Sequence, residues 1–259
     1  LVPTDFGLTA SDAAFGDVLG DDGIPEIAIG RLPVVSSEEL ITAIDKIVAF
    51  ESVSPEEWAA SLLLAADAPD SAGDFIAECL KLEELANLVD VARVELEGTE
   101  LEDARDALFS ALSAGAQVLT YVGHGTSNRF ARNGLLTRED VATLGNEGRT
   151  PVVIAATCVS GQFHLPGRDS LAETLVNTSG AGGVAVWAPT TLAYNEESML
   201  LVRAFHDVAF EHDTTVGEAI LEALRKTAGD GGSRASMKSI RQVFSLLGDP
   251  ATRLRMERR

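Results

Sequence analysis

Two residues capable of nucleophilic catalysis each follow a short apolar run. His124 lies two residues after the run 117–122, and Cys158 lies two residues after the run 151–156. Such β-branched runs predict buried parallel strands, whose carboxyl ends meet in one crevice. A thiol needs a base to become an efficient nucleophile, and histidine is the usual base near neutral pH. We therefore predict a cysteine hydrolase; an inert buried thiol and a histidine in a turn are the alternative.

A carbonyl bound near Cys158 needs hydrogen-bond donors for the negative charge that develops on its oxygen. The backbone N–H groups of Cys158 and Gly125 are placed to supply them, and each such donor is worth about 3–4 kcal/mol. Gly123 and Gly125 flank His124. Glycine at both positions lets the backbone turn sharply and approach a ligand.

Two carboxylates follow another predicted strand, over residues 61–66. Asp67 comes directly after it and could orient His124 from the same edge of the sheet. Asp74 begins the next predicted helix, where it is either an N-cap or a pocket carboxylate that selects a cationic side chain. Three aromatic residues near the same edge are candidates for the walls of a substrate pocket: Tyr194, Phe163 and Trp187, the last of which also fits a core position.

The segments around these residues alternate between predicted strands and predicted helices. This alternation predicts right-handed βαβ units and a mostly parallel sheet covered on both faces, an α/β fold in one domain over residues 1–259. Strands are expected over residues 26–30, 61–66, 91–96, 117–122, 151–156, 182–188 and 252–256, and helices over 36–50, 74–85, 102–114, 137–144, 169–176, 197–212, 216–226 and 236–247.

Composition argues against several classes of function. Forty acidic and twenty basic side chains give a net charge of −20, which disfavours a nucleic-acid partner. The acidity is typical of a salty or extracellular setting; a second interpretation is attraction of basic substrates, with Asp-rich loops holding a structural Ca²⁺ ion. No run of apolar residues is long enough for a membrane span. No cofactor motif is present, and Cys79 fits a core position better than a disulfide.

Several short motifs follow one another in a characteristic order. They occupy residues 25–32, 121–125, 155–163, 170–175, 182–186 and 248–250. In this order they resemble the gingipain-type cysteine peptidases, family C25 of the caspase-like clan CD. The resemblance implies a caspase-like three-layer α/β/α sandwich. It also implies hydrolysis of peptide bonds through a thioester acyl-enzyme.

The resemblance also implies roles for individual residues. Cys158 matches the nucleophile, His124 the catalytic histidine and Gly125 the residue whose N–H binds the oxyanion. Asp67 lies where some members carry a glutamate that assists the histidine, and Asp74 lies where arginine-cleaving members bind the basic side chain. The implied activity is a thiol endopeptidase that cleaves proteins or peptides after Arg or Lys, secreted by a bacterium or held at its surface.

Two alternatives to hydrolysis stay open. A cell-surface sortase of type IX secretion uses the same two residues and passes the acyl group to an amine instead of water. A catalytically silent caspase-like module would serve in binding or regulation. Because the family's N-terminal subdomain is not recognisable in residues 1–259, we also expect that a preceding segment or a partner chain covers one flank.

Overall fold

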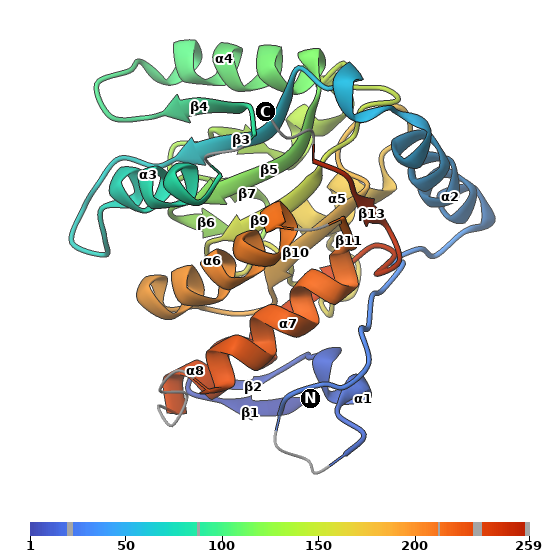
Figure 1. Cartoon of the computed structure of the whole chain (residues 1–259), viewed down its shortest axis with the longest axis vertical. Helices are drawn as coiled ribbons and strands as arrows, with labels where there is room; N and C mark the ends of the chain where they lie inside the picture. The colour runs from blue at the N-terminus through green and yellow to red at the C-terminus, as the bar shows by residue number, and fades with distance from the viewer. Residues whose placement is uncertain (20–22, 87–88, 212, 230–234, 257–259) are drawn as a thin grey trace.

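A six-stranded sheet forms the centre of the computed structural model, which describes residues 1–19, 23–86, 89–211, 213–229 and 235–256 (Figure 1). The strand order is β12-β10-β9-β5-β3-β4. β12 runs antiparallel to β10, and the other neighbouring pairs are parallel. The strands are β3 (Ala60–Ala66), β4 (Val91–Glu95), β5 (Ala116–Val122), β9 (Val152–Ala156), β10 (Ala185–Pro189) and β12 (Phe244–Leu247).

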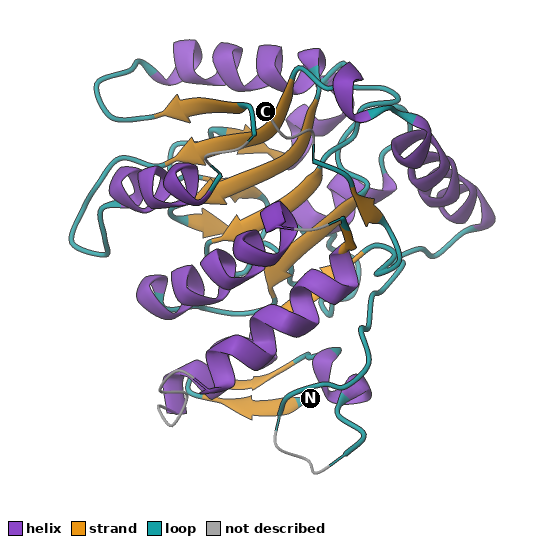
Figure 2. Ribbon diagram, viewed as in Figure 1, coloured by secondary structure: helices purple, strands orange, loops and turns teal. Residues whose placement is uncertain are grey.

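Helices cover both faces of this sheet (Figure 2). On one face lie α3 (Phe75–Leu85) and α6 (Asn195–Glu211), with α7 (Val216–Gly229) and α8 (Ala235–Val243) packed against α6. On the other face lie α4 (Leu101–Ala114) and α5 (Leu171–Asn177). The predicted three-layer α/β/α sandwich with a mostly parallel sheet is therefore confirmed.

Smaller elements complete the fold. A hairpin of β1 (Val2–Thr4) and β2 (Gly7–Thr9) lies beside α8 (Figure 1). A small antiparallel sheet of β6 (Gly125–Thr126), β7 (Arg129–Phe130) and β8 (Leu136–Thr137) follows β5. The remaining elements are α1 (Ala13–Gly16), α2 (Ser37–Ser52), the 3₁₀ helices η1 (Pro55–Glu57) and η2 (Arg138–Thr143), and the pair β11 (Thr214–Thr215) and β13 (Arg253–Leu254).

The register of the parallel strands sets where the functional side chains emerge. Every residue of β3, β5 and β9 is buried, because helices cover both faces of these strands. Val122 of β5 pairs with Ala66 of β3 on one side and with Ala156 of β9 on the other. The three strands therefore end level with one another, and the residues that follow them meet at one edge of the sheet.

Two element predictions are wrong. The predicted helix over 236–247 stops at Val243, and Phe244–Leu247 forms the edge strand β12. The apolar residues there also fit a helical period, but Leu246 and Leu247 enter opposite core layers, as alternating strand residues must. The predicted strand over 26–30 does not form; the chain there makes an isolated bridge at Arg31 to Leu247 instead.

The predicted helix over 197–212 matches α6 as far as Glu211, and His212 lies outside the described residues. Among the helices that are described, none combines the length and the apolar character that crossing a lipid bilayer requires.

Candidate active site

His124 and Cys158 line one cavity of about 280 Å³ at the carboxyl ends of β5 and β9. The structure thus brings the imidazole and the thiol to the same edge of the sheet, as predicted from the two strand ends. Parallel α/β sheets place ligand sites at this edge, and the cavity has that position. Its other walls include Ala72, Phe75, Thr157, Tyr194, Asn195 and Ser198.

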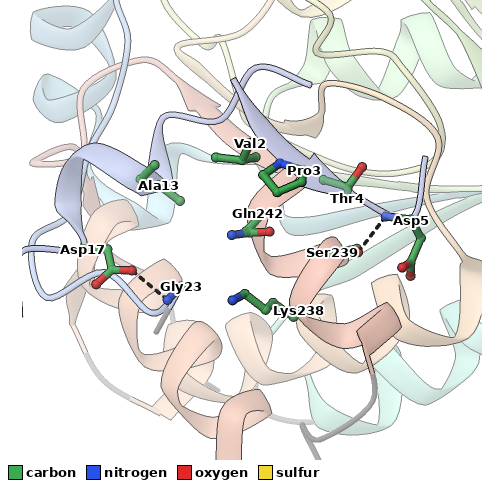
Figure 3. A pocket seen from close by; sticks show the side chains of 11 residues that line it. Val2, Pro3, Thr4, Asp5, Ala13, Asp17, Gly23, Lys238, Ser239 and Gln242 are labelled. Carbon is green, nitrogen blue, oxygen red and sulfur yellow. Dashed lines mark hydrogen bonds between the residues drawn. The ribbon is translucent and has the colours of Figure 1, made fainter. Parts of the chain in front are cut away.

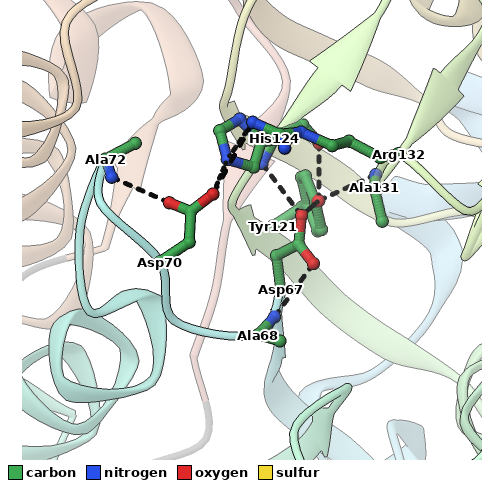
Figure 4. Close-up of polar contacts among 8 residues, drawn as sticks. All are labelled: Asp67, Ala68, Asp70, Ala72, Tyr121, His124, Ala131 and Arg132. Carbon is green, nitrogen blue, oxygen red and sulfur yellow. Dashed lines mark hydrogen bonds and ion pairs between the residues drawn. The ribbon is translucent and has the colours of Figure 1, made fainter.

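The backbone of His124 is held by two buried side chains (Figure 4). The Tyr121 hydroxyl donates to the His124 carbonyl at 2.6 Å, and the Asp67 carboxylate accepts from the His124 N–H at 3.2 Å. The same hydroxyl accepts from the Ala131 N–H at 2.8 Å. Burial raises the pKa of Tyr121 well above its ordinary value, so this hydroxyl keeps its proton. Asp67 thus positions His124 through its backbone N–H, and among the described residues no hydrogen bond joins it to the imidazole.

The carboxylate that contacts the imidazole is Asp70, which the sequence analysis missed. Its Oδ2 lies 2.9 Å from His124 Nε2, and its other oxygen accepts from the Ala72 N–H at 2.8 Å. The hydrogen bonds from Ala72 and His124 lower the pKa of Asp70, so it is ionised at neutral pH. The sequence signal for this contact is the Pro-Asp-Ser run at 69–71, which favours a turn that folds back over the strand end.

One charged group and one aromatic ring also lie beside the imidazole. Arg132 Nη2 lies 3.2 Å from His124 Nε2 and 3.6 Å from the Asp70 carboxylate. The Phe75 ring meets the imidazole edge-on, with ring centroids 5.3 Å apart. The apolar contact on one side and the polar contacts on the other fix the orientation of the ring.

The glycines that flank His124 are required for close packing. A Cβ on Gly123 would overlap Asp67 and Tyr121, and a Cβ on Gly125 would overlap Thr157. The space that the sequence analysis assigned to a ligand is therefore filled by the protein. Gly125 pairs with Phe130 in the small β6–β7 sheet and is not among the residues that line the cavity.

Cys158 stands at a strained turn after β9. Val159 has a φ of +50°, a left-handed conformation that is costly for a β-branched residue. Its N–H donates to the Thr191 carbonyl at 2.9 Å, which holds the turn in place. The half-buried Cys158 sulfur lies 3.6 Å from the Ala193 carbonyl. The turn thus presents the thiol at the cavity wall while its backbone is tied to the segment after β10.

Two predicted substrate-binding residues lie at the cavity or next to it. Tyr194 lines the cavity, is 44% exposed, and packs its ring on Phe6 at 4.8 Å. Asp74 is exposed and caps α3, where its Oδ1 accepts from the Ala77 N–H at 2.9 Å. Asp74 does not line the cavity, but the next residue, Phe75, does.

Of the other two aromatic candidates, Phe163 does not line the cavity, and Trp187 takes the core position that the sequence also allowed. Trp187 is only 1% exposed and packs between Phe205 and Phe244 in the core, because β10 is covered on both faces. Phe163 lies beneath the Arg31 guanidinium, 4.4 Å from the ring centroid, and does not line the cavity. Position near a strand end in the sequence did not distinguish a wall residue from a core residue.

A larger cavity, of about 500 Å³, lies between the β1–β2 hairpin and α8 (Figure 3). Two of its polar contacts are internal: Asp5 N–H donates to Ser239 Oγ at 3.0 Å, and Asp17 accepts from the Gly23 N–H at 2.7 Å. It contains neither a thiol nor an imidazole. Volume therefore does not identify the reactive site. Over the described ranges, no group of three His, Cys, Asp or Glu side chains is arranged to hold a metal ion.

Comparison with known proteins identifies the relatives of this chain. The family model described as "Peptidase family C25" matches residues 1–255. Gingipain R2 of Porphyromonas gingivalis is 26% identical over 194 residues, which cover 70% of this chain and 26% of that protein. Gingipain R1 of the same species is 26% identical over 194 residues and is covered for 19% of its length. This chain thus spans about a quarter or less of these relatives.

Solved structures share the fold. The crystal structure of the Arg specific cysteine proteinase gingipain R superposes with a TM-score of 0.83 at 20% identity, over 95% of this chain and 60% of that chain. A complex of the pro- and mature domains of a Porphyromonas gingivalis gingipain gives a TM-score of 0.82 at 21% identity, with the same coverage. These likenesses support the caspase-like architecture at the level of the fold.

Proposed function

The chain belongs to peptidase family C25, and on that basis we propose that its cavity hydrolyses peptide bonds, with Cys158 as nucleophile and His124 as general base and acid. The observation that carries this proposal is the shared cavity at the ends of β5 and β9, which both side chains line. A thiol next to a base oriented by a carboxylate is the arrangement that acyl transfer requires.

The proposed reaction has two steps. His124 takes the thiol proton, the sulfur attacks the scissile carbonyl carbon, and the amine leaves with the proton that His124 returns to it. Water then loses a proton to His124, attacks the thioester carbon, and releases the acid and the free thiol. Asp70 supports both steps because an Nε2–H donated to its carboxylate leaves Nδ1 free as the base.

We assign the oxyanion to the backbone N–H groups of Cys158 and Gly125, as the sequence suggested. In the described part of the chain, the Cys158 N–H makes no hydrogen bond to the protein, so it is available to a substrate. Each donor is expected to contribute about 3–4 kcal/mol to the transition state.

Asp74 is the proposed anchor for an Arg or Lys side chain before the scissile bond. Its Oδ1 caps α3, and among the described residues no hydrogen bond uses Oδ2. Asp74→Asn separates the two roles, because Asn caps helices as well as Asp does but carries no charge. We expect this variant to remain folded and to lose its preference for Arg over a neutral residue by about tenfold or more. An unchanged preference would remove Asp74 from the substrate site.

We also propose that residues 1–259 form a single peptidase domain that acts on proteins or peptides, secreted by its bacterium or held at its surface. The net charge of −20 and the relationship to gingipains support this setting. A solved relative pairs its mature domain with a pro-domain. A flanking segment or partner chain on this domain is therefore part of the proposal.

Cleavage of an Arg-ended fluorogenic peptide tests the function. Wild type and Cys79→Ala are expected to cleave it, whereas Cys158→Ala is expected to lose at least about a thousandfold in kcat/KM. Cys79→Ala is the matched control because it removes the other thiol, which is buried. Substantial turnover by Cys158→Ala would contradict the assignment. Adding an amine to the same assay shows by mass whether the acyl group passes to the amine or to water.

A further inference from the structure

Nε2 of His124 has two polar neighbours that require opposite protonation states of it. The Asp70 carboxylate, 2.9 Å away, can only accept and needs a proton on Nε2. The Arg132 guanidinium, 3.2 Å away, can only donate and needs a lone pair on Nε2. In the neutral ring, only one of these hydrogen bonds can form at a time.

The choice between them decides whether the histidine can activate the thiol. When Nε2–H donates to Asp70, Nδ1 has a lone pair and can accept the Cys158 proton. When Arg132 donates to Nε2, the ring proton is on Nδ1, and that nitrogen cannot act as a base. Asp70 therefore favours the reactive tautomer and Arg132 the unreactive one.

The backbone holds Arg132 at this place. The preceding residue, Ala131, has a φ of +59° and is fully buried. Its N–H donates to the His124 carbonyl and to the Tyr121 hydroxyl, both at 2.8 Å. The chain that carries Arg132 is thus tied to the same loop that carries the histidine.

The guanidinium itself remains accessible. The Arg132 side chain is 74% exposed and lies beside the Asp70 carboxylate and the His124 imidazole (Figure 4). His124 lines the cavity, whereas Arg132 and Asp70 do not. Because the histidine must protonate the leaving amine, the peptide that follows the scissile bond has to pass close to this ring.

Building on the proposed peptidase function, we propose that Arg132 is a positioning and specificity residue that binds an acidic side chain directly after the scissile bond. The planar guanidinium suits a carboxylate, with which it forms paired hydrogen bonds. When the substrate carboxylate binds the Arg132 guanidinium, His124 Nδ1 releases its proton to water and Nε2 gains a proton from water. The Nε2–H is then held by Asp70, and the thiol can be deprotonated. Without an acidic partner, Arg132 slows activation of Cys158.

Two peptides that differ only after the scissile bond test the specificity. With Asp in place of Ala at that position, wild type is expected to gain about tenfold in kcat/KM, the value of one charge-assisted contact. Arg132→Gln should cleave the two peptides at equal rates. Arg149→Gln is the matched control, because Arg149 is also an exposed cation but packs over Gly115, before the opposite end of β5. It should keep the wild-type preference.

Alkylation of Cys158 by iodoacetamide tests the tautomer competition without any peptide. Arg132→Gln is expected to react about threefold faster than either wild type or Arg149→Gln, because it loses one competing hydrogen bond. Cys158→Ala, which lacks the thiol, gives the background rate. Equal alkylation rates for wild type and Arg132→Gln, or an Asp preference that survives Arg132→Gln, would overturn the proposal. Because alkylation needs no bond cleavage, failure of the peptidase function would be recognised separately, as absent turnover of both peptides.

Discussion

The chain holds cysteine and histidine in two very different regions. At the carboxyl edge of the sheet, Cys158 and His124 are half-buried and line a cavity. In the interior, Cys79 lies within α3 and His206 lies within α6, both essentially without solvent contact. The residue types are the same, but the surroundings differ completely.

Burial removes the reactivity of Cys79 and His206. It raises the pKa of Cys79 to about 12 and lowers the pKa of His206 to about 3, because the charged forms lose their hydration. Cys79 therefore keeps its proton and His206 stays neutral near pH 7, where its Nε2 lies 2.9 Å from the Thr120 hydroxyl. The comparison shows that access to water and a charged partner, rather than residue type, makes a cysteine or histidine chemically useful.

The largest expected effect is on thiol reactivity. A pKa of about 12 leaves Cys79 with about a thousandfold less thiolate than an ordinary cysteine, before its burial is counted. In the native protein we expect iodoacetamide to modify Cys158 at least about a thousandfold faster than Cys79. Peptide mapping with time gives the two rates. Modification of both thiols at similar rates in the folded chain would remove the distinction between the regions, and modification in denaturant is the control for reagent access.

The next largest expected effect is on kcat, and it distinguishes the roles of the two carboxylates near His124, Asp70 and Asp67. Asp70→Asn removes the negative charge and replaces one of the two accepting oxygens with an NH2 group, which weakens the preference for the reactive tautomer, and we expect kcat to fall by about a hundredfold. Since Asp70 is on an exposed loop, the melting temperature should stay within a few degrees of the wild-type value. Asp67→Asn is the comparison variant: it weakens a buried contact to the backbone, so stability should fall as well as activity. A larger kcat loss in Asp67→Asn, with no change in stability, would reverse the assignment.

The positions of Cys158 and His124 followed from the sequence because strand ends are local signals. An apolar run that stops at a turn marks a strand end, and parallel neighbours bring such ends together. The contact with Asp70 did not follow, because it depends on how the loop after β3 folds back, and that path is set by the Asp70–Ala72 hydrogen bond. A contact made by a loop side chain leaves no periodic pattern in the sequence that could predict it.

The errors in the fold have a similar cause. Phe244–Leu247 continues the apolar spacing of α8, so the sequence alone favoured one long helix. Phe244–Leu247 forms a strand instead, because pairing with the edge of β10 satisfies its backbone groups and buries its side chains on both faces of the sheet. For Trp187, the core position that the sequence also allowed is the one observed, because Phe205 of α6 and Phe244 of β12 pack against its ring.

The smallest expected effect concerns the interior histidine and pH. Unfolded His206 binds a proton below about pH 6.5, whereas the folded side chain does not until about pH 3. The unfolded state therefore binds more protons in this window, and stability falls as the pH is lowered, by up to about 1.4 kcal/mol per pH unit. His206→Asn should lose this part of the slope between pH 6 and 4 in chemical unfolding. Identical slopes for the two proteins would show that His206 is accessible to protons in the folded state.

The most direct test of the central claim is the attachment site of an Arg-ended peptidyl acyloxymethyl ketone, measured by intact mass and peptide mapping. We expect one thioether adduct per chain, at Cys158, formed much more slowly in His124→Ala. An adduct at Cys79, no adduct on the folded protein, or labelling of His124→Ala at the wild-type rate would contradict the assignment of Cys158 and His124.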